Sequence, residues 1–142
     1  MIIFVTSFEN RLIMSIFSKI IAGDIPSYKI AENEHFFAFL DINPVKKGHT
    51  LIVPKLEVDK IFDVPDEYLS GILIFAKPIA KAIEKTFYCN RVNIITVGLE
   101  VPHAHIHLIP TNHSGDVDLG NKKLQLSKDE FLEIQRLIVD NL

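Results

Sequence analysis

Residues 101–110 read VPHAHIHLIP, and histidine occupies alternate positions of this stretch, at His103, His105 and His107. Side chains along a β-strand point alternately to its two faces, so residues two apart share a face. The stretch therefore predicts a strand with one apolar face and one face lined by imidazole rings. Burying a polar ring costs free energy unless the ring is hydrogen-bonded, so a row of such rings requires an explanation.

The histidine row has three interpretations on sequence alone. In the first, each ring is a structural group that finds its own hydrogen-bond partner in the core. In the second, two rings at positions i and i+2 share a zinc ion with a carboxylate from elsewhere. All three cannot reach one ion on a regular strand, because the outer rings start roughly 13 Å apart. In the third, one ring is a nucleophile that attacks phosphorus.

The third interpretation uses the whole row. Imidazole, with a pKa near ~6.5, is largely neutral at cytosolic pH and keeps one ring nitrogen free to attack. The bond that forms between nitrogen and phosphorus is labile enough to break again. Neighbouring imidazoles can donate hydrogen bonds to the phosphoryl oxygens on which negative charge develops.

The rest of the chain predicts an α+β domain. Apolar spacing after Ser15 predicts a short N-terminal helix, and Ser127-x-x-Glu130 is a capping box that opens a C-terminal helix. Residues 66–87 predict a central amphipathic helix, kinked where Pro78 removes a backbone hydrogen bond. These helices are expected to pack against an antiparallel sheet of about five strands. The predicted strands are YKIAEN (28–33) and HFFAFLDINP (35–44) as a hairpin, HTLIVPK (49–55), RVNIITV (91–97) and the histidine stretch.

Length and composition limit the class of protein. The chain has 142 residues, of which 48% are hydrophobic and 23% charged, and its net charge of -3 is ordinary for one globular domain. The longest basic runs are the lysine pairs at 46–47 and 122–123, which we expect to be solvated loop charges. Neither a nucleic acid nor a membrane is therefore an expected partner. The single cysteine, Cys89, leaves no internal disulfide and favours a reducing compartment.

The first 13 residues stand apart from this pattern. They are apolar but interrupted by Glu9, Asn10 and Arg11, and they lack the positive region and the cleavage site of a signal peptide. The regular pattern starts directly after Met14, which is a candidate alternative start. We expect residues 1–13 to be a dispensable extension and residues 14–142 to form one domain.

Two segments carry a resemblance to a known family. HAHIHLI (103–109) fits the H-φ-H-φ-H-φ-φ signature of the histidine triad (HIT) family, in which φ is an apolar residue. GHTLIVPK (48–55) is similar to the G-H-x-L-[IV]-[IV]-P-K block of that family, and the likeness extends from Ser15 over most of the chain. The resemblance implies a HIT-like fold and a cytoplasmic enzyme with no obligatory metal or cofactor. It also implies a homodimer, for which residues 66–87 and 91–97 are the candidate interface.

The resemblance implies a role for each histidine. His105, in the middle, would attack the α-phosphate of a purine nucleotide conjugate and form a nucleotidyl-histidine intermediate. A phosphoramidate, a dinucleoside polyphosphate and an acyl-adenylate all present this phosphate. His107 would contact phosphate oxygens and help the leaving group. His103 would join His49, in the GHT block, in a supporting hydrogen-bond network, although composition alone would place His49 at the surface.

A nucleoside pocket is implied in the same way. Asp41 matches the acid that binds the ribose hydroxyls, although an Asp before an Asn-Pro turn can simply cap that turn. The apolar base pocket of the family is matched by residues whose spacing fits an ordinary core equally well. These residues are Ile16, Phe17, Ile20, Phe39 and Ile42.

The segment before the triad departs from the family pattern. Many members have a longer glycine-rich approach, with Gln and Ser or Thr after the last glycine to help hold phosphate. Here Leu99 and Glu100 follow Gly98. An anionic Glu100 near phosphate would repel it or act as an acid or base, and the alternative is a solvent-facing loop residue. The departure keeps open a nucleotide- or partner-binding module with little turnover. A metal-binding protein also remains an alternative, through the two-histidine zinc interpretation above.

Overall fold

An asparagine turn joins the first two strands of the sheet. The computed structural model describes residues 14–142, so the extension expected over residues 1–13 lies outside the described residues. The side-chain oxygen of Asn33 accepts hydrogen bonds from the backbone N–H groups of His35 and Phe36, at 3.0 and 2.9 Å, and the chain reverses there. This confirms the predicted hairpin.

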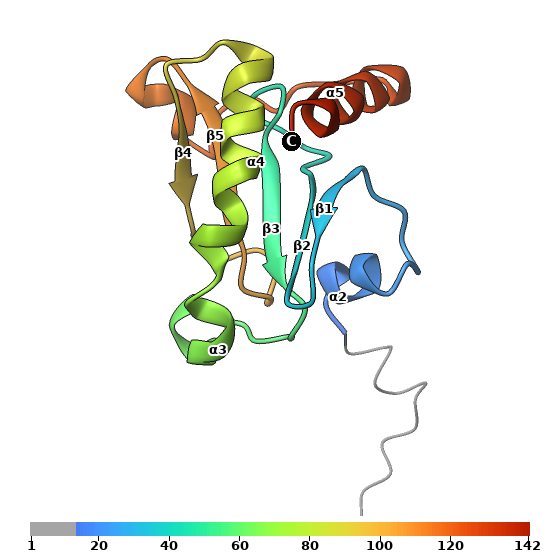
Figure 1. Cartoon of the computed structure of the whole chain (residues 1–142), viewed down its shortest axis with the longest axis vertical. Helices are drawn as coiled ribbons and strands as arrows, with labels where there is room; N and C mark the ends of the chain where they lie inside the picture. The colour runs from blue at the N-terminus through green and yellow to red at the C-terminus, as the bar shows by residue number, and fades with distance from the viewer. Residues whose placement is uncertain (1–13) are drawn as a thin grey trace, which may run out of the picture.

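The described residues form one five-stranded sheet in the order β1-β2-β3-β5-β4, with each neighbouring pair antiparallel (Figure 1). The α+β class and the antiparallel sheet predicted from the sequence are therefore confirmed. The strands are β1 (Lys29–Glu32), β2 (Phe36–Leu40), β3 (Thr50–Pro54), β4 (Arg91–Ile95) and β5 (Ile106–Thr111).

The central helix expected over residues 66–87 is two helices rather than one. The chain breaks at Ser70 and Gly71, and glycine is a poor residue for a helix interior. The second helix then continues through Pro78. The helices are α2 (Ile16–Ile21), α3 (Asp66–Leu69), α4 (Ile72–Phe87) and α5 (Lys128–Asp140), with 3-10 turns η1 (Ile61–Asp63) and η2 (Ser114–Val117).

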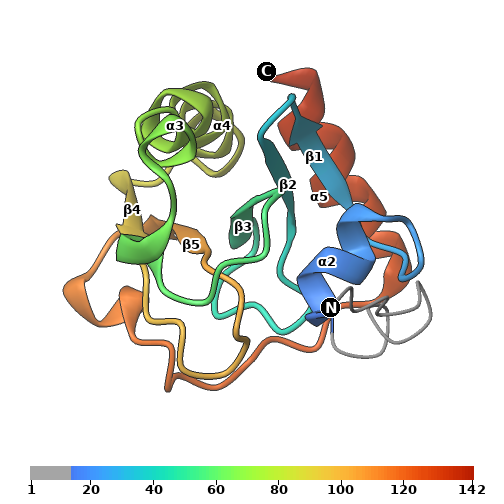
Figure 2. The same cartoon turned by 90° about the horizontal axis from the view of Figure 1, so that it is seen from below.

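The central strands are buried on both faces. On one face, α4 and α5 pack over a large cluster that includes Ile52 and Leu108. The opposite face carries a smaller cluster, here called the Phe17 cluster. Figure 2 shows α2 beside the β1–β2 hairpin and α4 at the other end of the sheet, near β4. The Phe17 cluster consists of Phe17 from α2, Phe37 and Phe39 from β2, and Leu51 and Val53 from β3.

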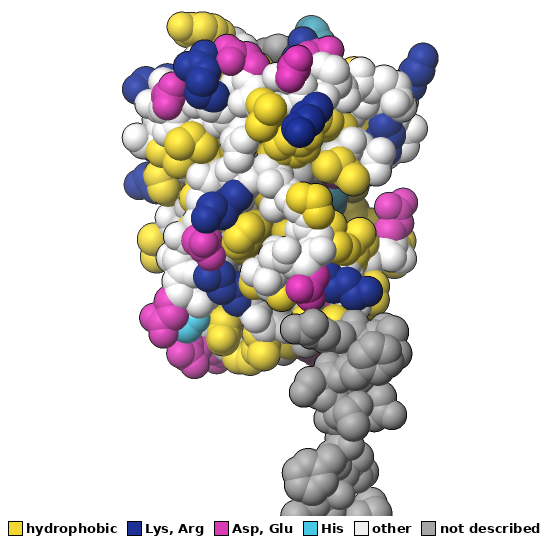
Figure 3. All heavy atoms as spheres, turned by 90° about the vertical axis from the view of Figure 1, so that its right-hand side faces the viewer, with side chains coloured by type: hydrophobic (Ala, Val, Ile, Leu, Met, Phe, Trp, Pro, Cys, Tyr) yellow, Lys and Arg dark blue, Asp and Glu magenta, His cyan; other side chains and the backbone are white. Residues whose placement is uncertain are grey.

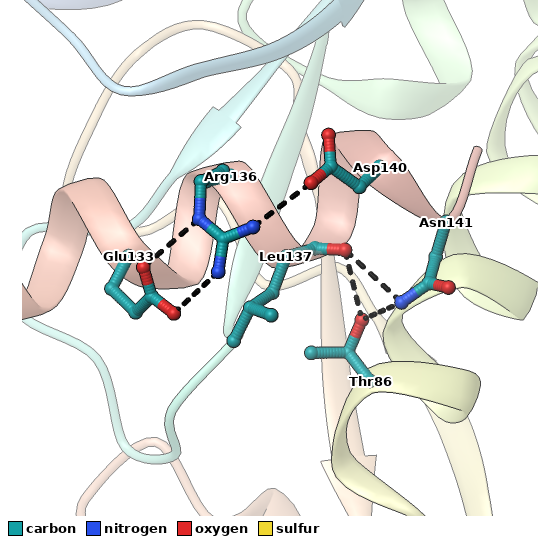
Figure 4. A network of polar contacts seen from close by, with 6 residues as sticks. All are labelled: Thr86, Glu133, Arg136, Leu137, Asp140 and Asn141. Atoms are coloured by element: carbon teal, nitrogen blue, oxygen red, sulfur yellow. Dashed lines mark hydrogen bonds and ion pairs between the residues drawn. The ribbon is translucent and has the colours of Figure 1, made fainter.

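Polar side chains hold both ends of α5. The predicted cap at Ser127 is confirmed, because its hydroxyl accepts the backbone N–H of Glu130 at 3.1 Å. At the other end, the Asn141 side chain donates to the Thr86 hydroxyl and to the Leu137 carbonyl, at 3.0 Å each, and so ties α5 to α4 (Figure 4). These contacts hold α5 against α4 on the face that carries the large cluster. The Phe17 cluster lies on the opposite face.

The histidine stretch is not the regular strand that its alternation predicts. β5 begins at Ile106, so His107 is the only triad histidine on it. The pairing of β3 with β5 reaches Ile52 opposite Ile106, and the pairing of β4 with β5 reaches Ile95 opposite His107. The segment before Ile106 therefore extends beyond the pairing of both neighbouring strands.

Other hydrogen bonds hold this segment. The backbone N–H of His103 donates to the Val101 carbonyl at 2.8 Å, which makes a tight turn, and that of Ala104 donates to the Val58 carbonyl at 2.7 Å. Side chains 103–110 are all buried, the apolar and the polar alike. The expected regular strand is therefore wrong for residues before Ile106, although Ile106 and Leu108 still lie in the cluster under α4 and α5 while His103 and His105 lie against Phe17.

Two features bear on the membrane and nucleic-acid partners that composition disfavours: the helices of the described residues and the charges on one face. Among residues 14–142, no helix has the length and apolar character needed to cross a bilayer. On the face shown in Figure 3, lysine and arginine side chains are interspersed with aspartate, glutamate and apolar side chains. This face has no continuous basic patch that would attract a phosphate backbone.

Candidate active site

The triad histidines adjoin the Phe17 cluster. Leu51 on β3 lies opposite Phe39 on one side and His107 on the other, so all three side chains share one face of the sheet. Phe17 packs edge-on against His105, with ring centroids 4.9 Å apart. An apolar cluster and a row of imidazoles thus meet on the side of the sheet away from α4 and α5.

His105 has one ring nitrogen fixed and the other free. Its Nδ1 atom lies 2.7 Å from the backbone oxygen of His103, and because a carbonyl only accepts, Nδ1 carries the proton. Nε2 of the neutral ring keeps its lone pair, and no hydrogen bond to it is found within residues 14–142. A ring with a fixed tautomer and an unused lone pair is what a nucleophile requires.

A second tautomer is fixed by the backbone of Val45. The Val45 N–H donates to Nδ1 of His49 at 3.2 Å, so the neutral His49 ring carries its proton on Nε2. Nε2 lies 2.8 Å from Nδ1 of His107 and donates to it. The neutral His107 ring consequently carries its own proton on Nε2, where it is available to a ligand oxygen. This proton lies next to the nucleophile, because the His105 and His107 ring centroids are 5.0 Å apart.

Both members of this pair are neutral at pH 7. Loss of hydration, and to a smaller extent the ammonium of Lys123, lowers the pKa of His49 to about 4. Loss of hydration is also the main cause that lowers the pKa of His107 to about 4; nearby His49, His105 and Lys123 add to it and Asp41 opposes it. One proton, not two, therefore lies between the rings.

His103 has partners of its own, so its expected participation in a network with His49 is wrong. Nε2 of His103 donates to the Pro54 carbonyl at 2.8 Å, and Nδ1 lies 2.8 Å from the Ser15 hydroxyl. The backbone leaves the strand before Ile106, which brings this ring to the end of β3 rather than to His49. Burial lowers the pKa of His103, and the Pro54 hydrogen bond and the Glu57 carboxylate act against that shift.

Asp41 has the capping role that its sequence context left open, and it also lies beside the histidine pair. One carboxylate oxygen accepts the backbone N–H of Asn43 at 2.8 Å and so caps the turn. The other lies 3.5 Å from Nε2 of His49. The carboxylate is therefore held at the edge of the histidine pair, where a ligand hydroxyl can reach it.

The set Asp41, His49 and His107 tests the metal interpretation. Their donor atoms lie within 4.8 Å of one another. Two nitrogens bound to one tetrahedral zinc at 2.0–2.1 Å are about 3.3 Å apart, whereas the two nitrogens here are 2.8 Å apart and share a proton. Coordination would move the His49 proton to Nδ1, which already faces the Val45 N–H. The arrangement fits a hydrogen bond better than a metal ion.

The expected base-pocket residues divide into two groups. Phe17 and Phe39 are buried in the Phe17 cluster, and Ile20 is half-buried against it. Ile16 and Ile42, by contrast, are 46% and 61% exposed and lie outside the cluster. The other members of the cluster were missed in the sequence, although their alternate positions on β2 and β3 are a signal that could have found them.

Gly98 and Glu100 make no hydrogen bond or ion pair with the histidines among the described residues. Both lie on the loop between β4 and β5, where Gly98 has a φ of +69° and Glu100 is exposed. Within residues 14–142, no hydrogen bond or ion pair joins Glu100 to a histidine. The solvent-facing alternative is thus the one that the geometry favours for Glu100.

Lys123 and Glu57 were missed by the sequence analysis. Lys123 is half-buried rather than fully solvated, because the Leu124 N–H donates to the Pro44 carbonyl at 2.8 Å and holds this segment beside the site. Glu57 bonds to the start of α2. No spacing rule connects either residue with a histidine far away in the chain, so the sequence offered no signal for them.

The chain is similar in sequence to a known family and to several known proteins. The family model described as "HIT domain" matches residues 22–114. "Protein hit" of Bacillus subtilis is 42% identical over 106 residues, which cover 71% of this chain and 73% of that protein. "Adenosine 5'-monophosphoramidase HNT1" of Saccharomyces cerevisiae is 45% identical over 96 residues, and the match spans 67% of this chain but only 61% of the yeast enzyme.

A solved structure agrees with these matches. The crystal structure of a Hit-like protein from Bartonella henselae superposes with a TM-score of 0.78 at 28% sequence identity. The superposition covers 90% of this chain and 96% of that one. The sheet and helix layer described above are therefore shared along nearly the whole described chain.

Proposed function

Because the chain belongs to the histidine triad (HIT) family, we propose that it is a nucleotide hydrolase or transferase acting at the α-phosphate of a purine nucleotide conjugate. The observation that carries this proposal is the hydrogen bond from Nδ1 of His105 to the His103 carbonyl, which leaves Nε2 free. A phosphoramidate is our first substrate, because a relative named for that activity is 45% identical. Dinucleoside polyphosphates and acyl-adenylates present the same α-phosphate.

In the first step, Nε2 of His105 attacks the α-phosphorus of the bound substrate. A bond forms between nitrogen and phosphorus, and the bond from phosphorus to the leaving group breaks with its electron pair. The Nε2–H of the neutral His107 donates a hydrogen bond to a phosphoryl oxygen, and the departing amine or oxygen takes its proton from solvent water. The fixed tautomer of His107 supports this role, because it sets a donor rather than an acceptor beside the nucleophile.

In the second step, water attacks the nucleotidyl-histidine. The nitrogen–phosphorus bond breaks, a nucleoside monophosphate is released, and His105 regains its lone pair. The proton that the attacking water loses goes to solvent and balances the proton that the leaving group took up, so the site starts the next cycle unchanged. If an alcohol or amine takes the place of water, the same intermediate gives a transferase reaction.

We place the nucleoside along the Phe17 cluster. The base would lie against Phe17 and Phe39, with the exposed Ile16 and Ile42 closing over it. Asp41 would accept both ribose hydroxyls through the carboxylate oxygen that the turn does not use. Val101 packs against the same cluster and would border the pocket.

We also propose a homodimer built through β4. This strand is an edge strand of the sheet that residues 14–142 form (Figure 1), and an edge strand presents backbone groups with which a further strand can pair. Ile94 on β4 and Leu73 and Ile74 on α4 are exposed apolar residues in the two regions that the sequence analysis chose. Light scattering should give twice the monomer mass of 16.1 kDa, and Ile94→Arg should give the monomer. The single Cys89 supports the cytoplasm as the place of action.

The decisive experiment is hydrolysis of an adenosine phosphoramidate by the wild type, by His105→Ala and by His113→Ala, with and without a chelator. His113 is an exposed histidine outside the triad and is the matched control. We expect AMP release by the wild type and the control, none by His105→Ala, and no effect of the chelator. Rapid acid-free quenching and intact-mass analysis should show a nucleotidyl adduct that His105→Ala lacks.

Each other outcome selects a different class. AMP binding without turnover in any variant would show a nucleotide-binding module. Loss of activity or of thermal stability on chelation would show a metal-binding protein and overturn the hydrogen-bonded assignment of His49 and His107. Normal turnover by His105→Ala would place the nucleophile elsewhere.

A further inference from the structure

A chain of hydrogen bonds leads from the exposed Glu57 to the buried His103. The Glu57 carboxylate accepts the backbone N–H of Ser15 and, at 3.0 Å, the hydroxyl of Ser18. Both serines belong to the start of α2. Nδ1 of His103 lies 2.8 Å from the Ser15 hydroxyl and 3.3 Å from that of Ser18. A carboxylate after β3, the first turn of α2 and the first triad histidine are thus one polar unit.

The Pro54 carbonyl and the Ser18 backbone N–H decide which group donates and which accepts in each of these bonds. Nε2 of His103 donates to the Pro54 carbonyl, so Nδ1 of the neutral ring accepts. The Ser15 oxygen accepts the backbone N–H of Ser18 at 3.1 Å as the helix cap, and its own proton goes to His103. The Ser18 hydroxyl proton goes to Glu57. Both nitrogens of the His103 ring are therefore held, one by β3 and one by α2.

The orientation of His103 matters for its neighbour. The backbone carbonyl of His103 is the group that accepts Nδ1–H of His105. This part of the backbone lies outside the strand pairing of β5, so the sheet does not fix it. Phe17, from the same helix as the serines, contacts both rings, with centroids 6.0 Å from His103 and 4.9 Å from His105. The Ala104 N–H, in the same peptide group as this carbonyl, donates to the Val58 carbonyl at 2.7 Å, and the side-chain bonds of His103 add to that backbone bond where strand pairing is missing.

We propose that Glu57 is a positioning residue for the nucleophile. By accepting from the Ser15 backbone and the Ser18 hydroxyl, Glu57 places the Ser15 hydroxyl that bonds the His103 ring. It thereby helps to hold the carbonyl that orients His105, and it ties the helix carrying Phe17 to the histidine loop. This inference rests on the proposed function in one respect, namely that His105 is the nucleophile. Glu57 itself contacts neither His105 nor the predicted substrate pocket.

The test compares Glu57→Leu, which removes the acceptor, with Glu57→Gln, whose amide oxygen accepts the same two bonds. Glu34→Leu is the matched control, because Glu34 is an exposed glutamate in the β1–β2 turn. We expect kcat for the adenosine phosphoramidate to fall about tenfold in Glu57→Leu, with KM within about twofold of the wild type. Glu57→Gln should restore most of kcat, and Glu34→Leu should match the wild type.

A second readout does not depend on turnover. Correlation NMR of the histidine ring nitrogens reports which nitrogen of His103 carries the proton. Glu57→Leu should change the His103 signals, and Glu57→Gln and Glu34→Leu should keep them. If Glu57→Leu fails to fold, Ser18→Ala replaces it, because this variant removes the donor to Glu57 and leaves the Ser15 cap.

Several results would overturn the proposal. Unchanged His103 signals in both Glu57→Leu and Ser18→Ala would show that the chain of bonds does not hold the ring. Changed signals with an unchanged kcat would show that the ring is held without consequence for His105. A wild type that turns over no substrate would instead contradict the proposed function, and the NMR arm would still decide whether Glu57 positions His103.

Discussion

Nε2 of His49 lies 2.8 Å from Nδ1 of His107, and this bond joins two residues 58 positions apart in the chain. His49 is only 1% exposed, so water does not compete for the bond. The Val45 N–H fixes the direction of the bond, and the direction decides that the neutral His107 ring carries its proton on Nε2, beside His105. The backbone of one loop thereby sets the protonation pattern of a site on a distant strand.

The buried pair should make the protein sensitive to mild acid. The unfolded chain binds a proton on each histidine below about pH 6.5, whereas burial lowers the folded pKa of His49 and of His107 to about 4. The unfolded state therefore binds more protons in this range, and the free energy of unfolding falls as the pH falls from about 6.5 to about 4. The expected slope is about 1.4 kcal/mol per pH unit for each such proton, measured by urea denaturation.

Carboxylates do not produce the same change. The pKa of Asp116 is held well below its usual range by backbone N–H bonds from Asn112 and His113, so its contribution is lost only below about pH 4. His49→Asn removes one of the two titrating rings and should flatten the slope above pH 4.5. A slope identical to that of the wild type would show that the pair does not control acid stability.

Replacing His49 should reduce turnover without contact to the substrate. His49→Ala removes the donor that fixes the His107 tautomer, so His107 presents a proton to the pocket only part of the time. We expect kcat to fall about 10- to 100-fold and KM to change little. Steady-state kinetics on the adenosine phosphoramidate measures both. An equal rise in KM would assign His49 to substrate binding instead.

The parts of the fold with local signals were predictable. Asn33 between two β-rich runs and the Ser127 cap before an amphipathic run each depend on neighbours within a few residues. The histidine stretch failed for the opposite reason. Alternation describes which face a side chain would take on a strand, but whether residue 105 is on a strand depends on how far β3 and β4 extend beside it.

The site was predictable only in part, on the same physical grounds. The nucleophile candidate His105 followed from the motif, whereas the burial of His49 depends on His107, which no local pattern places beside it. Lys123 looked like a solvated lysine because the contact of Leu124 with Pro44, which brings it close, joins segments far apart in the chain. Long-range contacts of this kind are what the structure adds.

Asp41 should act on the ribose rather than on the phosphate. Asp41→Ala removes a charged acceptor of two hydroxyls, which is worth about 1.5–3 kcal/mol, so KM should rise about 10- to 100-fold. The 2′-deoxy substrate already lacks one hydroxyl and should be a poorer substrate for the wild type. The two changes should not add when combined, because they remove the same interaction. Full additivity in kcat/KM would contradict the ribose assignment.

Substitution of Ile16 and Ile42 tests whether these residues belong to a nucleoside pocket or to the ordinary core. They are 46% and 61% exposed, so Ile16→Ala and Ile42→Ala should each change the free energy of unfolding by less than about 1 kcal/mol. Phe17→Ala, in the buried cluster, should cost about 3–5 kcal/mol and serves as the comparison. If the exposed pair closes over the base, AMP should bind each isoleucine variant severalfold more weakly at unchanged stability, as measured by calorimetry. Wild-type affinity in both variants would remove these residues from the pocket and leave the base against Phe17 and Phe39 alone.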